Sequence, residues 1–133
     1  MIGYESAGGV SLDAIFSTIP INSRVALKID IEGAEYRILN QIVRHQTMIS
    51  GLAIEFHDVD LHRQRISDFI QALTELEPVW VHGNNYGGVD PQGDPIVLEM
   101  SFAQVASRVS GAGVQPRTSP NDPTVPEILL RFA

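Results

Sequence analysis

The chain has 133 residues, of which 44% are hydrophobic and 19% are charged, and its net charge is −7 at neutral pH. These values are typical of a globular domain that buries enough surface to fold, and they argue against a disordered or membrane-spanning chain. The lack of cysteine and of a secretory leader pattern predicts a cytoplasmic protein. Because lysine and arginine are few and scattered, nucleic acid is not an expected partner.

Strands and helices are predicted to alternate from residue 24 onward. The first strand is apolar without clean alternation, which is typical of a strand covered on both faces. Gly33 ends that strand, and the apolar residues after it recur at helical spacing. A second helix is predicted later in the chain, and Pro78 is expected to stop it. In chain order the predicted elements are strand 24–31, helix 34–46, strand 49–56, helix 61–76, strand 79–82 and strand 96–102.

This order predicts an α/β fold with parallel crossovers, in which the turn-rich loop before the last strand permits an antiparallel return. We expect residues 1–133 to form a single domain. Residues 1–23 form an amino-terminal lead-in and residues 24–103 form the α/β core. Residues 104–133 form a tail rich in serine, glycine and proline, irregular until EILLRF offers a final short strand.

Polar side chains gather where the first three predicted strands end, and these strands are expected to be neighbours in the sheet. In an open parallel sheet, ligands bind beyond the carboxyl ends of the strands, so these groups are expected to share one rim. A carboxylate beside an imidazole forms a general base suited to neutral pH. The candidate catalytic residues are Asp30, Glu32, His57 and His82, and the candidate substrate-binding residues are Glu55, Asn84 and Asn85.

Structural interpretations of the same residues remain open. Asp30 and Glu32 are also suited to the start of the following helix, where negative charge is stabilised. Glu35 is expected to be a solvated acid of the first helical turn, and Lys28 to pair with Asp30 or Glu55. Asn84 and Asn85 are also ordinary turn residues. No compact ligand motif such as HExxH occurs, so no metal site is predicted.

Several segments carry a family resemblance. They are LKIDIEGAEYRIL (27–39), IEFH (54–57), VHGNN (81–85), IVLEMSF (96–102) and PNDPTVPEILLRF (120–132). In this order they resemble the carboxyl-terminal half of the FkbM-family S-adenosylmethionine-dependent methyltransferases, and KIDIEGAE is the most specific segment. The resemblance implies a partial Rossmann-like methyltransferase sheet, mostly parallel with an antiparallel late strand. It also implies methyl transfer to a hydroxyl of a sugar or similar small molecule.

The resemblance carries expectations for residues and partners. It places Asp30 and Glu32 beside the cofactor and acceptor, and His57 and His82 on the acceptor side. The glycine-rich cofactor half of the family has no counterpart before residue 24, so the chain is expected to be truncated and doubtful as an enzyme alone. The strand at 24–31 then loses its neighbour, which predicts a homodimer or a complex with a separate cofactor half at that edge.

Two further hypotheses belong to other classes of protein. A non-catalytic binding or assembly module would keep the polar rim for a carbohydrate or a protein partner. A metal-dependent hydrolase would need Asp30, Glu55 and His57 within ligand distance of one another. In each case, specificity is expected from the loop 83–95 and the tail 104–126.

Overall fold

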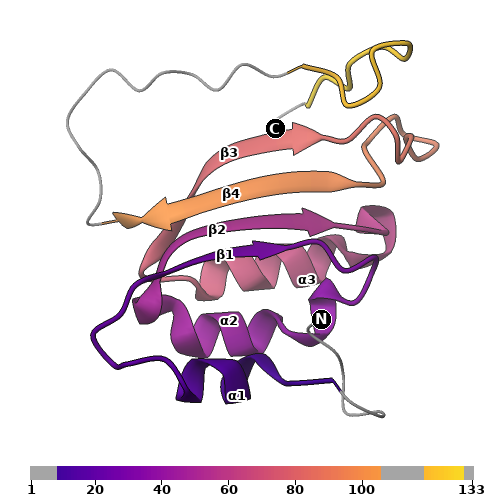
Figure 1. Cartoon of the computed structure of the whole chain (residues 1–133). Coiled ribbons are helices and arrows are strands. Elements are labelled where there is room, and N and C mark those ends of the chain that lie inside the picture. The colour runs from indigo at the N-terminus through magenta and orange to yellow at the C-terminus, as the bar shows by residue number, and fades with distance from the viewer. Residues whose placement is uncertain (1–8, 106–118, 131–133) are drawn as a thin grey trace.

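The computed structural model of the protein describes residues 9–105 and 119–130, and Figure 1 shows the arrangement of its elements. No helix in these two ranges is long and apolar enough to cross a membrane. In chain order the elements are α1 (Leu12–Ser17), β1 (Val25–Ile29), the 3-10 turn η1 (Glu35–Arg37), α2 (Leu39–His45), the 3-10 turn η2 (Gln46–Met48), β2 (Ile49–Phe56), α3 (Val59–Ala72), β3 (Leu76–Gly83) and β4 (Leu98–Gln104).

The strands form one open mixed sheet in the order β1-β2-β4-β3. β1 and β2 are parallel, whereas β4 is antiparallel to both of its neighbours. β1, β2 and β3 therefore run in the same direction, and their carboxyl ends lie at the same end of the sheet as the start of β4 (Figure 1). The predicted α/β class is confirmed, and the architecture is compatible with a Rossmann-like sheet.

The expectation that the first three strands would be direct neighbours is wrong. β4 lies between β2 and β3, because the loop after β3 reverses the chain through a bridge between Val89 and Pro95. β4 buries Met100 and Phe102 in the core, as suits a central strand. β3 carries the exposed Pro78 at an irregularity in its ladder, as suits an edge strand.

Most predicted boundaries lie within a few residues of the observed ones, and the strand at 49–56 is confirmed exactly at both ends. The helix predicted from residue 34 begins as η1 and becomes α-helical only at Leu39. Pro78 does not stop α3, which already ends at Ala72. In place of a final strand, Ile128 makes one isolated β-bridge to Gly83, and residues 131–132 lie outside the described ranges.

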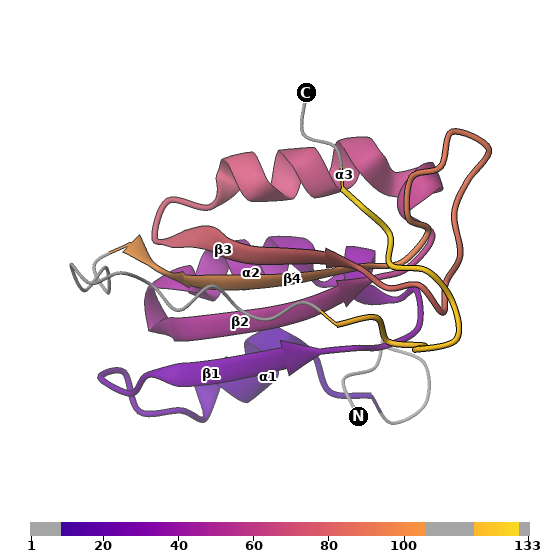
Figure 2. The same ribbon diagram turned by 90° about the horizontal axis from the view of Figure 1, so that it is seen from above.

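Within the described residues, α1, α2 and α3 lie on one side of the sheet, as Figures 1 and 2 show from two directions. The core between helices and sheet contains Leu12, Phe16, Ile29, Ile42, Ile54, Phe56, Ile66, Phe69, Met100 and Phe102. Alternate residues point to the other face, where Ala26, Lys28 and Ala53 are exposed. The polar groups at the strand ends lie along one end of this open face.

Candidate functional site at the strand ends

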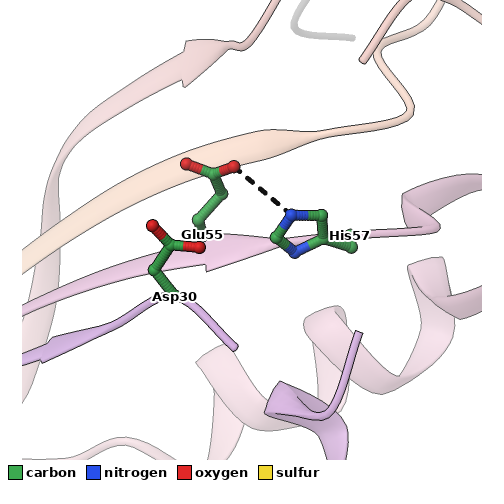
Figure 3. A group of neighbouring side chains, drawn as sticks. All are labelled: Asp30, Glu55 and His57. Carbon is green, nitrogen blue, oxygen red and sulfur yellow. Dashed lines mark ion pairs between the residues drawn. The ribbon is translucent and has the colours of Figure 1, made fainter. Parts of the chain in front are cut away.

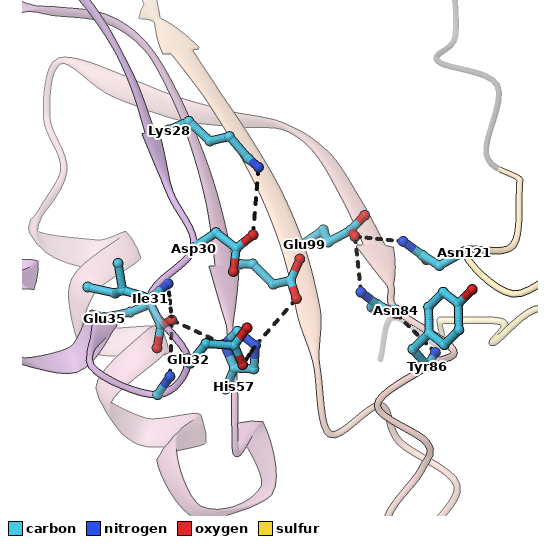
Figure 4. A network of polar contacts seen from close by, with 12 residues as sticks. Lys28, Asp30, Ile31, Glu32, Glu35, His57, Asn84, Tyr86, Glu99 and Asn121 are labelled. Atoms are coloured by element: carbon cyan, nitrogen blue, oxygen red, sulfur yellow. Dashed lines mark hydrogen bonds and ion pairs between the residues drawn. The ribbon is translucent and has the colours of Figure 1, made fainter. Parts of the chain in front are cut away.

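Four polar side chains form a row across the open face. In the strand pairing Glu55 lies opposite Glu99, and Glu99 lies opposite His82. Asp30 follows Ile29, whose partner in β2 is Ile54, so Asp30 comes level with Glu55. We call this row, together with His57 just beyond β2, the strand-end rim; Figure 4 shows the polar contacts around Asp30, His57 and Glu99.

His57 is held in a defined orientation at the rim. Its Nδ1 lies 3.1 Å from Oε1 of Glu35, and its Nε2 lies 3.4 Å from Oε1 of Glu55 and 3.4 Å from Oε2 of Glu32. The side chain is only 16% exposed. The contact of Nδ1 with Glu35 is the shortest of the three, and a carboxylate accepts hydrogen bonds, so we assign the proton of a neutral ring to Nδ1 and its lone pair to Nε2; a doubly protonated ring would donate from both nitrogens.

Glu35 is fully buried, so the expectation of a solvated acid is wrong. Its Oε1 accepts hydrogen bonds from the backbone N–H groups of Ile31 at 3.1 Å and Gly33 at 3.2 Å, as well as the contact from His57. Its Oε2 is buried without a hydrogen-bond partner. Glu35 therefore ties the turn after β1 to the imidazole after β2.

The turn after β1 contains two successive residues in the left-handed region. Glu32 has a φ of 55° and Gly33 a φ of 90°. Gly33 fulfils the expected sharp turn, since glycine adopts positive φ without steric cost. The same turn leaves the side chain of Glu32 86% exposed beside His57.

Tyr36 fixes the other side of this segment. Its hydroxyl donates a hydrogen bond of 2.5 Å to the backbone carbonyl of His57. Burial raises the pKa of Tyr36 well above its ordinary value, and the charge of Glu35 acts in the same direction. The hydroxyl therefore keeps its proton and remains a donor at physiological pH.

The acids of the rim differ in their surroundings. Burial raises the pKa of Glu55 above its ordinary value, and the neighbouring charge of Asp30 raises it further. Asp30 is more exposed, and its carboxylate lies 3.6 Å from Nζ of Lys28, which is the pairing expected from the sequence. The Lys28 side chain is 79% exposed, so this ion pair adds little to stability.

His82 lies at the far end of the rim in a different environment. It is 4% exposed, its Nδ1 lies 3.1 Å from Glu99, and its Nε2 lies 2.6 Å from Glu127 of the tail. Both ring nitrogens thus face carboxylates, as those of His57 do, but one of the carboxylates here belongs to the tail. This geometry favours a role in anchoring the tail, and a catalytic role for His82 stays a prediction.

The side chains of Asn84 and Asn85 also make hydrogen bonds within the protein. Asn84 donates to Glu99 and accepts from the N–H of Tyr86, while Asn85 exchanges hydrogen bonds with backbone groups of the tail, among them Asp122 at 2.8 Å. Both are buried, at 8% and 5% exposure. Their observed contacts position the tail, and substrate binding by either residue stays a prediction.

One hollow adjoins the rim, and a second lies against the tail. A cleft of about 260 Å³ on the open face is lined by Lys28, Glu55, Trp80, Glu99 and Ser101, among others. A larger hollow of about 470 Å³ lies between the loop that includes Val89 and the tail around Ile128. Of the tail 104–126 expected to determine specificity, Val125 and Pro126 line this hollow together with residues of the loop 83–95, and residues 106–118 lie outside the described ranges.

Comparison of the chain with models of known protein families, with curated proteins and with solved structures finds no match. The resemblance to FkbM-family methyltransferases therefore stays a prediction. The geometry of the described residues is the basis for the proposals below.

Proposed function

We propose that this chain is an FkbM-like methyltransferase domain that provides the acceptor side of the reaction. The acceptor would be a sugar or similar small molecule that receives a methyl group from S-adenosylmethionine on a hydroxyl. The observation that supports this most is the pairing of buried Glu35 with His57, which turns Nε2 toward the other acids of the rim. The sequence motifs around both residues are those that resemble the family.

The chemistry assigned to His57 is proton removal. A hydroxyl oxygen must lose its proton as the methyl group arrives in line with it, and a positioned imidazole can accept that proton. Glu35 holds the ring from the buried side and stabilises the charge that develops on it. Glu55 and Asp30 lie where neighbouring hydroxyls of the acceptor would donate hydrogen bonds, and the cleft beside Trp80 offers space for its ring.

Cofactor binding is assigned only in part to this chain. The two turns that lead from a strand into a helix are IEGAE after β1 and HDV after β2, and neither is a glycine-rich turn of the kind that cradles a cofactor. The described residues therefore do not form a complete cofactor site. The proposal leaves the remaining contacts to a separate cofactor half, with Asp30 and Glu32 at the boundary.

The test is a titration of ¹⁵N-labelled protein with S-adenosylmethionine, followed through the backbone amide signals. We expect saturable shifts confined to residues 30–33 and 55–58, since the sulfonium is positively charged and the rim is acidic. Adenosine triphosphate is the matched control, because it shares the adenosine but has the opposite charge. Absence of shifts at these amides up to about 1 mM ligand, which corresponds to about −4 kcal/mol of binding, would count against the methyltransferase proposal.

A second candidate is a non-catalytic assembly module, and the position of β1 favours it. β1 pairs with β2 alone among the four strands, and it lies at one edge of the sheet. An edge strand offers backbone donors and acceptors to another chain, as in strand addition. We expect sedimentation at micromolar concentration to show a homodimer, with slowed amide exchange at residues 25–29. A monomer whose β1 amides exchange freely would refute association at this edge.

A further inference from the structure

We propose that Asp30, Glu55 and His57 bind a divalent transition-metal ion. Each residue offers one ligand atom, and these atoms all lie within 4.8 Å of one another. Figure 3 shows the three side chains converging from the ends of β1 and β2. The proposal does not depend on methyl transfer, and its three residues are those that the metal-dependent hydrolase hypothesis required within ligand distance of one another.

The orientation of His57 is the feature that distinguishes this cluster from a chance group of surface acids. Histidines that ligate metals usually donate their second ring N–H to a carboxylate or carbonyl, which directs the remaining lone pair at the ion. His57 has this arrangement, with Nδ1 on Glu35 and Nε2 facing Glu55. The Nε2 atom of His57 and the carboxylate of Glu55 thus point toward the same position, where a metal ion would lie.

The surroundings of Glu35 support the metal site independently of the three proposed ligands. Glu35 is 0% exposed, it is aimed at the ring of His57, and its Oε2 is buried with no hydrogen-bond partner. Burying an ionised carboxylate is costly unless positive charge or hydrogen bonds compensate it. A cation on Nε2 would polarise the Nδ1–H toward Glu35 and so supply part of that compensation. We assign Glu35 as a positioning residue of the site.

The ligand types indicate the class of ion. Calcium takes six to eight oxygen ligands, and magnesium favours carboxylates and water over imidazole, whereas two carboxylates and one imidazole suit Mn²⁺ or Zn²⁺. Three protein ligands would leave coordination positions open for water or a hydroxyl, and Glu55 also lines the cleft beside Trp80. A hydroxyl or water in such a position would become more acidic.

Lys28 is a positive group beside the proposed site. Its ammonium lies 3.6 Å from Asp30, on a side chain that is 79% exposed. Metal binding would displace this ammonium, at small cost because exposed ion pairs contribute little.

The experiment is isothermal titration calorimetry of chelator-treated protein with MnCl₂ and with ZnCl₂, with no cofactor added. The wild type should bind one equivalent. Asp30→Asn should lower the affinity by about 100-fold or more, because losing a ligand costs more than the 10- to 100-fold typical of an outer-shell partner. Asp30 is exposed, so this variant is expected to fold. Asp68→Asn, at an exposed acid of α3 outside the cluster, is the matched control and should bind like the wild type.

Glu35→Gln adds a readout that a purely structural role would not change. In a variant that circular dichroism shows to be folded, metal affinity should fall by about 10- to 100-fold. Equal affinity in the wild type and Asp30→Asn, or no binding by the wild type up to about 1 mM of either ion, would overturn the proposal. Neither result bears on the titration with S-adenosylmethionine, so the two proposals can fail separately.

Discussion

Replacing Phe56 with alanine is expected to lower the free energy of unfolding by about 3–5 kcal/mol. Phe56 is 0% exposed and is the last residue of β2. Its ring lies 5.9 Å from that of Tyr36 and 6.2 Å from that of Phe69, so its removal leaves a cavity between the sheet and α3. The strand end that positions His57 is packed through this contact, and equilibrium unfolding in urea measures the effect.

Leu61→Ala is the control for this prediction. Leu61 is also a large apolar residue, but it is 74% exposed in the first turns of α3. Its replacement should change stability by no more than about 0.5 kcal/mol. If Phe56→Ala were as mild as Leu61→Ala, the described packing of β2 against α3 would be incorrect.

Replacing Glu35 with alanine is expected to cost about 2–4 kcal/mol of stability, because backbone donors lose their partner and a buried space is left behind. The affected donors belong to Ile31 and Gly33, within the turn that follows β1. His57 loses its contact with the buried carboxylate in the same variant. Thermal and urea unfolding of the purified variant measure the loss.

Glu35→Gln separates the two roles of this residue. The amide oxygen can still accept from the two backbone donors, so the loss should be clearly smaller than for alanine. A solvated acid of the first turn would instead tolerate both replacements almost equally. Equal and small effects of alanine and glutamine would therefore restore the expectation drawn from the sequence.

The sequence predicted the rim because the relevant signals are local. The apolar segment before Asp30 and the segment ISGLAIEF before His57 each mark a buried strand, and parallel strands bring their carboxyl ends together. The convergence of Asp30, Glu55 and His57 follows from that rule and is observed. Composition and alternation also sufficed for the α/β class.

The sequence did not predict the parts of the site that depend on distant partners. Glu35 lies 22 residues before His57, and nothing in its immediate neighbourhood marks it as buried. Glu99 joins the rim only because β4 inserts between β2 and β3, an order that periodicity does not specify. One signal was available, since Pro78 within a strand indicates an edge position for β3.

The contact between His82 and the tail could not be predicted either, because the two residues are far apart in the sequence. The partner of His82 is Glu127, which lies 45 residues further along the chain, in a segment with no regular periodicity. Asn85 likewise contacts backbone groups 37 or more residues away. Paired asparagines followed by glycines, as in NNYGG (84–88), are typical of a turn, and that pattern gives no information on which segment will pack against it.

The central claim is that buried Glu35 orients His57 so that Nε2 faces Asp30 and Glu55 at one rim. Long-range ¹H–¹⁵N correlation spectra of the histidine rings test it most directly, at a pH where the ring of His57 is neutral. We predict that the proton resides on Nδ1 and that the unprotonated nitrogen is Nε2. A proton on Nε2, or an equal mixture of the two tautomers, would contradict the claim.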